Sequence, residues 1–272
     1  MTQKSKAELL LRLHTGPDLL VLPNAWDALS ARIIEAEGFP AVASSSAGCA
    51  AVLGYPDGQR IPRSEMCFLV KKMAGAVEVP LTADLEAGYD DVAQTARDLI
   101  DAGAVGLNFE DMVDSELLEI DDQVARLQTL RRVADEAGIP LVINARTDIY
   151  LAEHGDAATR FERSVERLNR FREAGADCLF VPGVSDAETI ARLVREINGP
   201  VNILATPACP SLARLRDLGV ARVSLGSGPS RVAMGAFRRF AHDVLFHGKL
   251  DGLQTEAISY GEVQALLARR SS

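Results

Sequence analysis

The sequence predicts an α/β fold, a (β/α)8 TIM barrel in which eight parallel strands alternate with helices. Eight short apolar segments alternate with segments of helical spacing along the 272 residues, and each could be covered on both faces. Glycine closes several helices, where a left-handed cap turns the chain back toward the sheet; these glycines are Gly38, Gly103, Gly138, Gly175, Gly199 and Gly219. The main alternative is an open, doubly wound sheet.

The elements follow in chain order, starting with a leading helix at 4–13. The predicted strands are apolar runs that end at polar or turn-forming residues: 19–22, 41–43, 81–85, 105–109, 141–145, 178–181, 201–204 and 222–225. The helices between them show helical apolar spacing at 28–37, 63–76, 91–102, 121–137, 157–174, 187–197 and 211–218. A longer excursion rich in glycine and proline follows the second strand.

After the eighth strand, a long helix is predicted up to residue 246, and a last amphipathic helix at 260–269. We therefore expect one barrel domain over residues 1–272 with a C-terminal helical extension from about residue 229. The extension is longer than closing a barrel requires. It either packs on a neighbouring subunit or caps the surface of its own chain.

Composition limits the function classes. The net charge of -9 and the pI near 5.1 argue against nucleic acid or an anionic membrane as the main partner. The N-terminus has no uninterrupted apolar core of a secretion signal, and no apolar run reaches 18 residues. The four cysteines are widely spaced and form no C-x-x-C pair, which is typical of reduced thiols. These features predict a cytoplasmic protein.

In such a barrel the active site lies at the carboxyl ends of the strands. Asp84 and Glu86 follow the third apolar run, and the alternation of strand side chains places them on one face. Two carboxylates so placed repel each other unless a cation or a proton lies between them. The alternative is a solvated acidic turn.

The strand ends carry no histidine, which argues against a hydrolytic triad and against zinc. They leave an oxygen cluster of Asp84, Glu86 and Glu110, which suits a hard cation such as Mg²⁺ or Mn²⁺. Arg146, one strand further round, could pair with a substrate carboxylate. The alternative for Arg146 is a structural ion pair with Asp148 or Glu110.

Two further strand ends carry weaker signals. Ser45 and Ser46, with the backbone N–H groups that follow them, could cradle an anion, although a serine-rich turn is common without a ligand. The glycine-containing turn at 226–228 lies where many barrels hold phosphate. Cys209 is the one cysteine on a loop at this end, and packing is its more common role.

Six segments resemble the isocitrate lyase/phosphoenolpyruvate mutase superfamily in that family's order, over residues 23 to about 240. They are Asn24-Ala25-Trp26-Asp27-Ala28-Leu29-Ser30-Ala31, Ser44-Ser45-Ser46, Gly54-Tyr55-Pro56-Asp57, Ala83-Asp84-Leu85-Glu86-Ala87-Gly88-Tyr89, Asn108-Phe109-Glu110-Asp111 and Asn144-Ala145-Arg146-Thr147-Asp148. The resemblance implies a barrel whose last helix is exchanged between the subunits of a homodimer, which often pairs into a homotetramer.

The resemblance also implies site roles. Mg²⁺ would be held directly by Asp84 and mainly through water by Glu86, Glu110 and Asp57, with Asp57, Glu110 and Arg146 as catalytic residues. The substrate would be a small 2-oxo or 2-hydroxy acid, whose oxygens contact the metal at Asp84. Arg146 and the turn of Ser44, Ser45, Ser46 and Ala47 would hold the substrate. The shared chemistry forms and quenches a pyruvate-like enolate, which needs a cation beside the developing negative oxygen.

The sequence departs from its relatives in the loop after the fourth strand. Lyases that split isocitrate or methylisocitrate carry a Lys-Lys-Cys-Gly-His loop there, whereas residues 111–123 contain no cysteine, histidine, lysine or arginine. This places the chain in a subgroup without the catalytic-cysteine loop and disfavours those two activities. Phosphonopyruvate enzymes use a Lys/Thr/Asn version, and an acidic loop beside a phosphonate would cost on the order of a few kcal/mol per close like-charge pair. At the position where the family's mutases carry a histidine, this chain has Pro182.

Three functions remain open. The first is a Mg²⁺-dependent lyase or decarboxylase that cleaves a carbon–carbon bond of a small 2-oxo or 2-hydroxy (di)carboxylic acid. The second is phosphonopyruvate-type mutase or hydrolase chemistry at a phosphorus–carbon bond. The third is a 2-oxo-acid binding protein without turnover. The sequence does not specify the leaving group or the group that protonates the enolate.

Overall fold

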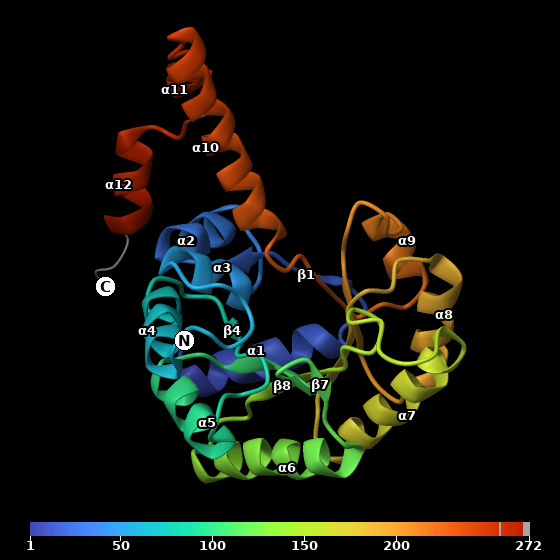
Figure 1. Cartoon of the computed structure of the whole chain (residues 1–272). Coiled ribbons are helices and arrows are strands. Elements are labelled where there is room, and N and C mark those ends of the chain that lie inside the picture. The colour runs from blue at the N-terminus through green and yellow to red at the C-terminus, as the bar shows by residue number, and fades with distance from the viewer. Residues whose placement is uncertain (256, 269–272) are drawn as a thin grey trace.

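The computed structural model describes residues 1–255 and 257–268, and it shows the predicted barrel of parallel strands ringed by helices (Figure 1). Its sheet has the strand order β1-β11-β10-β9-β8-β5-β4-β3-β2, with every pairing parallel. The strands are β1 Leu20–Leu22, β2 Asn24–Ala25, β3 Val42–Ser44, β4 Leu81–Asp84, β5 Gly106–Glu110, β8 Val142–Arg146, β9 Cys178–Val181, β10 Val201–Leu204 and β11 Arg222–Ser224.

The ninth strand, β2, was not predicted, and it follows the predicted first strand on the other side of Pro23. Pro23 has no N–H to donate to a ladder, so it separates β1, which pairs with β11, from β2, which pairs with β3. The Asn24 side chain spans the break: its Nδ2 donates to the Ser44 carbonyl at 2.7 Å, and its Oδ1 accepts from the Leu225 N–H at 2.8 Å. The two strands therefore close the ring between β11 and β3.

The outer helices match the predicted helices to within a few residues. They are α2 Ala28–Ala36, α4 Arg63–Ala74, α5 Val92–Asp101, α6 Ile120–Glu136, α7 Arg160–Glu173 after a 3-10 turn at Ala157–Thr159, α8 Ala187–Glu196 and α9 Leu212–Asp217. Five of the six predicted glycine caps are left-handed, but Gly199 is not, because α8 ends in the extended residue Ile197. A short helix that the sequence did not reveal, α3 Ser46–Val52, begins inside the serine segment.

The leading helix, α1 Gln3–Thr15, closes the floor of the barrel. Its Ala7 and Leu10 are fully buried in one cluster with the strand residues Leu20 and Leu22. His14 also points inward, where burial lowers its pKa from 6.5 to about 4, with Arg222 adding to the shift. The interior is therefore open to ligands at the other end, where the strands finish.

The C-terminal extension projects from the barrel (Figure 1). Helix α10 Gly228–His247 runs away from the strands, the short α11 Gly252–Thr255 follows, and α12 Tyr260–Ala268 returns to pack against α2. Position 269, predicted to end the last helix, lies outside the described residues. Large apolar side chains of α10 stay open to solvent: Val232 is 74%, Phe237 64% and Leu245 75% exposed. No helix in the described part of the chain is long and apolar enough to cross a membrane.

Candidate active site at the strand ends

A cavity of about 160 Å³ opens at the carboxyl ends of the strands. Six of the predicted site residues line it: Ser45, Ser46, Ala47, Asp57, Asp84 and Arg146. The other three lie just outside the lining. Ser44 accepts from the Asp84 N–H, Glu110 pairs with Arg146, and Glu86 is repelled by Asp84 and Asp57. The strand order thus brings the predicted set together from strands β3, β4, β5 and β8 and from the loop that carries Asp57.

Asp84 ends strand β4 and is 8% exposed. Its Oδ2 accepts hydrogen bonds from the Ser46 N–H at 3.2 Å and the Ser46 Oγ at 2.8 Å, while its own N–H donates to the Ser44 Oγ at 2.9 Å. Its Oδ1 is buried and has no hydrogen-bond donor among the described residues. The serines therefore hold Asp84 in place and leave one oxygen bare. Ser45 caps helix α3 by accepting from the Gly48 N–H.

Glu86 lies in the turn after β4 with a left-handed φ of 53°, which is uncommon for a residue other than glycine. Its Oε2 accepts from the Gln59 N–H, which ties it to the loop of Asp57, and its Oε1 is buried with no partner in the described chain. Burial, followed by repulsion from Asp84 and Asp57, raises the pKa of Glu86 from 4.5 to about 7. The carboxylates at the site therefore carry more negative charge than Arg146 neutralises.

Arg146 ends strand β8 between two carboxylates. Its Nη1 contacts the Glu110 Oε2 at 2.8 Å, and its Nε and Nη2 contact the two Asp148 oxygens at 2.6 and 2.9 Å. Both partners considered from the sequence are thus present, and Arg146 lines the cavity at the same time. Burial raises the pKa of Glu110 well above 4.5, although Arg146 opposes the rise. The Phe180 ring lies 5.9 Å from the Arg146 guanidinium carbon and supports it.

The residues at this end fit a divalent cation. Acceptor-only oxygens that are buried without a donor, as on Asp84 and Glu86, are unfavourable unless a cation or a proton satisfies them. Carboxylate oxygens are the ligands that Mg²⁺ and Mn²⁺ prefer. The sequence assignment of Asp84, Glu86 and Glu110 to a metal remains a prediction that this geometry supports.

Asn108 lines the cavity, although the sequence did not single it out as a site residue. Its Oδ1 accepts from the Asn144 Nδ2 at 2.8 Å and from the Arg222 Nη2 at 3.1 Å. Arg222 is fully buried, and burial lowers its pKa to about 10. The signal available in the sequence was spacing: Asn108 lies two residues before Glu110 in a strand, and therefore on the same face.

The loop after β5 is anchored at its root. Asp111 is fully buried, where its Oδ2 accepts from the Arg167 Nε at 2.8 Å and its Oδ1 from the Asp148 N–H at 3.0 Å. Beyond it, β6 Met112–Val113 and β7 Glu116–Leu117 form a small hairpin. Asp114 and Ser115 turn it with left-handed φ values of 48° and 69°. Asp111 is therefore structural, and the hairpin follows it in the 111–123 loop.

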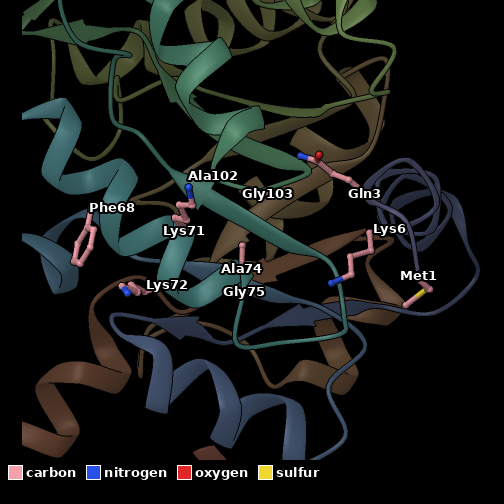
Figure 2. Close-up of a pocket in the computed structure, with 10 residues that line it drawn as sticks. All are labelled: Met1, Gln3, Lys6, Phe68, Lys71, Lys72, Ala74, Gly75, Ala102 and Gly103. Atoms are coloured by element: carbon pink, nitrogen blue, oxygen red, sulfur yellow. The ribbon is translucent and has the colours of Figure 1, made fainter. Parts of the chain in front are cut away.

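A larger cavity, of about 610 Å³, lies at the other end of the barrel and is lined by three lysines (Figure 2). Helices α4 and α5 end there, and the carbonyl ends of helices attract cations rather than anions. Lys6 donates to the Val77 carbonyl at 2.9 Å, and the Lys72 ammonium lies 5.1 Å from the centre of the Phe68 ring. Lys6 and Lys72 thus make local contacts, and this cavity lies away from the strand-end site.

Comparisons with known proteins agree with this geometry. A family model described as phosphoenolpyruvate phosphomutase matches residues 10–245. An uncharacterized protein of Mycobacterium tuberculosis is 35% identical over 258 residues, which cover 94% of each chain. A Burkholderia cenocepacia structure, provisionally assigned as a lyase or mutase, aligns with a TM-score of 0.90 at 35% identity, covering 98% of this chain and 97% of that one.

The structure of 2,3-dimethylmalate lyase, a member of the phosphoenolpyruvate mutase/isocitrate lyase superfamily, aligns with a TM-score of 0.85 at 27% identity, covering 96% of this chain and 94% of that chain. Other relatives are named 2-methylisocitrate lyase and oxaloacetate decarboxylase, each 26% identical, and carboxyvinyl-carboxyphosphonate phosphorylmutase, 29% identical. The family match over most of the chain shows that this protein belongs to the isocitrate lyase/phosphoenolpyruvate mutase superfamily.

Proposed function

We propose that this protein is a Mg²⁺- or Mn²⁺-dependent enzyme that cleaves a carbon–carbon bond of a small 2-oxo or 2-hydroxy acid, as a lyase or decarboxylase. The observation that carries the proposal is the bare Asp84 oxygen, in a cavity that Arg146 also lines. Relatives named as lyases and as a decarboxylase support this reaction class.

Asp84 would hold the cation directly, and Glu86, Glu110 and Asp57 would contact it mainly through water. The bound cation would neutralise the negative charge that develops on the substrate oxygen as the bond breaks.

The protein's own side chains orient the reactants. Arg146 still lines the cavity while Glu110 and Asp148 fix its plane, so it can pair with the substrate carboxylate in one orientation. Ser44 and Ser46 fix Asp84 from behind. The loop at 111–123 has no cysteine or histidine to give a proton, so we propose that water protonates the enolate.

A direct experiment measures pyruvate release from a panel of 2-oxo and 2-hydroxy acids, with Mg²⁺ and again with EDTA. The proposal expects release from at least one acid, lost with EDTA and restored by added Mg²⁺. No metal-dependent release from any acid, together with stabilisation by 2-oxo acids, would favour the binding-protein alternative. A changed phosphorus NMR spectrum of phosphonopyruvate would favour the phosphonate alternative.

We also propose that the protein works in the cytoplasm as a homodimer or homotetramer, in which α10 packs on a second copy. The exposed apolar side chains of α10 and the four cysteines without disulfides support these two proposals. Sedimentation equilibrium tests the assembly. Replacing Phe237 and Leu245 by serine should shift it toward monomer, and an unchanged mass would contradict the role of α10.

A further inference from the structure

Part of the far side of the strand-end cavity is apolar, next to Ser224 and Ser227, which also line it. Leu151, Phe180, Pro182 and Leu204 line it, and they come from the ends of β8, β9 and β10. Asp84 lies on the third barrel strand and Leu204 on the seventh, which is the opposite side of an eight-stranded ring. The cavity therefore has an acidic side, where a cation fits, and a hydrocarbon side facing it.

Two glycines allow the backbone to place these apolar side chains at the cavity. Gly183 has a φ of 92°, and a Cβ there would lie 2.7 Å from the Leu151 N atom, so only glycine lets the loop of Leu151 close against the end of β9. Gly226 has a φ of 55°, and a Cβ there would lie 3.1 Å from a methyl group of Leu204. Both contacts place the apolar side chains at the cavity in the ligand-free protein.

Leu151 lines the cavity and is 48% exposed, so much of its side chain is open to solvent. Phe180, in contrast, is 4% exposed and packs under Arg146. A ligand with a hydrocarbon tail would cover the open face of Leu151 and gain from removing that surface from water.

The charges that line the cavity also favour a ligand with a hydrocarbon tail. Of the described residues that line the cavity, Arg146 is the one cation, and Glu110 and Asp148 already contact it. A substrate's first carboxylate can share Arg146 and the metal. A second carboxylate would lie against leucine, phenylalanine and proline with no cation to pair with, and burying an unpaired charge is costly.

We infer that the substrate is a monocarboxylic 2-oxo or 2-hydroxy acid whose other end is an alkyl tail, seated on Leu151, Phe180, Pro182 and Leu204. This inference rests on the proposed function. A 4-hydroxy-2-oxo acid with an alkyl group on C4 fits both requirements. Its C3–C4 bond breaks with the electron pair kept on C3 as the pyruvate enolate. The C4 hydroxyl loses its proton to water as it becomes an aldehyde, and C3 takes a proton back from water, which gives pyruvate and an alkyl aldehyde.

The experiment measures binding of unreactive 2-oxo acids in the presence of Mg²⁺ by calorimetry. Pyruvate probes the acidic side alone, and 2-oxobutanoate and 2-oxopentanoate add one and two methylenes. Affinity should rise by up to about fourfold per buried methylene. In the matched pair of 5-methyl-2-oxohexanoate and 2-oxoglutarate, an isopropyl group replaces a carboxylate of similar shape at the same chain position, and the alkyl acid should bind at least tenfold tighter.

Two variants test the position of the tail. Leu151→Arg supplies the missing cation and should invert the preference between 2-oxoglutarate and 5-methyl-2-oxohexanoate. Leu212→Arg is the matched control, because Leu212 is 46% exposed on α9 and does not line the cavity; it should leave the preference unchanged.

The outcomes separate the two claims. If pyruvate does not bind with Mg²⁺, the proposed function fails and this inference falls with it. If pyruvate binds but chain length brings no gain, or if wild-type protein prefers 2-oxoglutarate, the inference is wrong while the proposed function stands. Faster cleavage of 4-hydroxy-2-oxoglutarate than of 4-hydroxy-2-oxopentanoate would also contradict the inference and leave the proposed function standing.

Discussion

Replacing Glu86 by glutamine should remove part of the pH dependence that we expect in the stability of the metal-free protein. The Glu86 pKa is raised from 4.5 to about 7, chiefly by burial and next by Asp84. Between these values the folded state keeps the proton and the unfolded state loses it, so stability falls as pH rises and the loss is complete above about pH 7. A rise of this size corresponds to roughly 3 kcal/mol at ~1.4 kcal/mol per pH unit.

Urea unfolding in EDTA measures this free energy at pH 4.5 and pH 8 for the wild-type and Glu86→Gln proteins. Between these two pH values, wild-type protein should lose roughly 3 kcal/mol more than the variant. Glu78→Gln, at an exposed carboxylate away from the site, is the matched control and should behave like wild type. Equal losses for wild type and Glu86→Gln would refute the electrostatic account of the site.

Mg²⁺ at about 100 times its Kd should stabilise the folded protein by ~2.7 kcal/mol in the same urea assay, and no stabilisation at any concentration would contradict a metal site. Asp111→Asn should destabilise the protein by about 3 kcal/mol, because it leaves the Arg167 guanidinium buried without its carboxylate; a loss below about 1 kcal/mol would make the pair unimportant. Gly183→Ala should lower the free energy of unfolding by about 3 kcal/mol, and Gly138→Ala by only about 1 kcal/mol. Both glycines have left-handed backbone, but a Cβ at Gly138 meets nothing within 4 Å. Equal losses would show that backbone strain alone matters.

Most of the barrel was predictable because the relevant signals are local. Apolar runs and glycine caps give the strands and the outer helices within a few residues. Strand β2 after Pro23 was not predicted, because a proline that follows an apolar run also marks an ordinary strand end. Likewise, helix α3 begins at Ser46 in a segment whose serines are typical of a turn.

The site was predictable where strand alternation applies and not where long-range packing decides. Asp84 and Arg146 could be placed at strand ends from spacing alone. The hydrogen bonds by which Ser46 holds Asp84 could not be predicted, because the two residues lie 38 positions apart in the sequence. The contact between Asn108 and Arg222 joins strands 114 residues apart in sequence, and no local pattern reports it. The apolar side of the cavity depends similarly on Gly183 meeting Leu151.

Binding of Mn²⁺, followed by electron paramagnetic resonance of the free ion, tests the central claim most directly. The account predicts one Mn²⁺ bound per wild-type chain, with competition by Mg²⁺. Asp84→Asn, which keeps an oxygen acceptor for Ser46 but removes the charge, should weaken this binding at least tenfold. Wild-type protein that binds no Mn²⁺, or Asp84→Asn protein that binds it as tightly as wild type, would contradict the assignment of the strand-end carboxylates as a metal site.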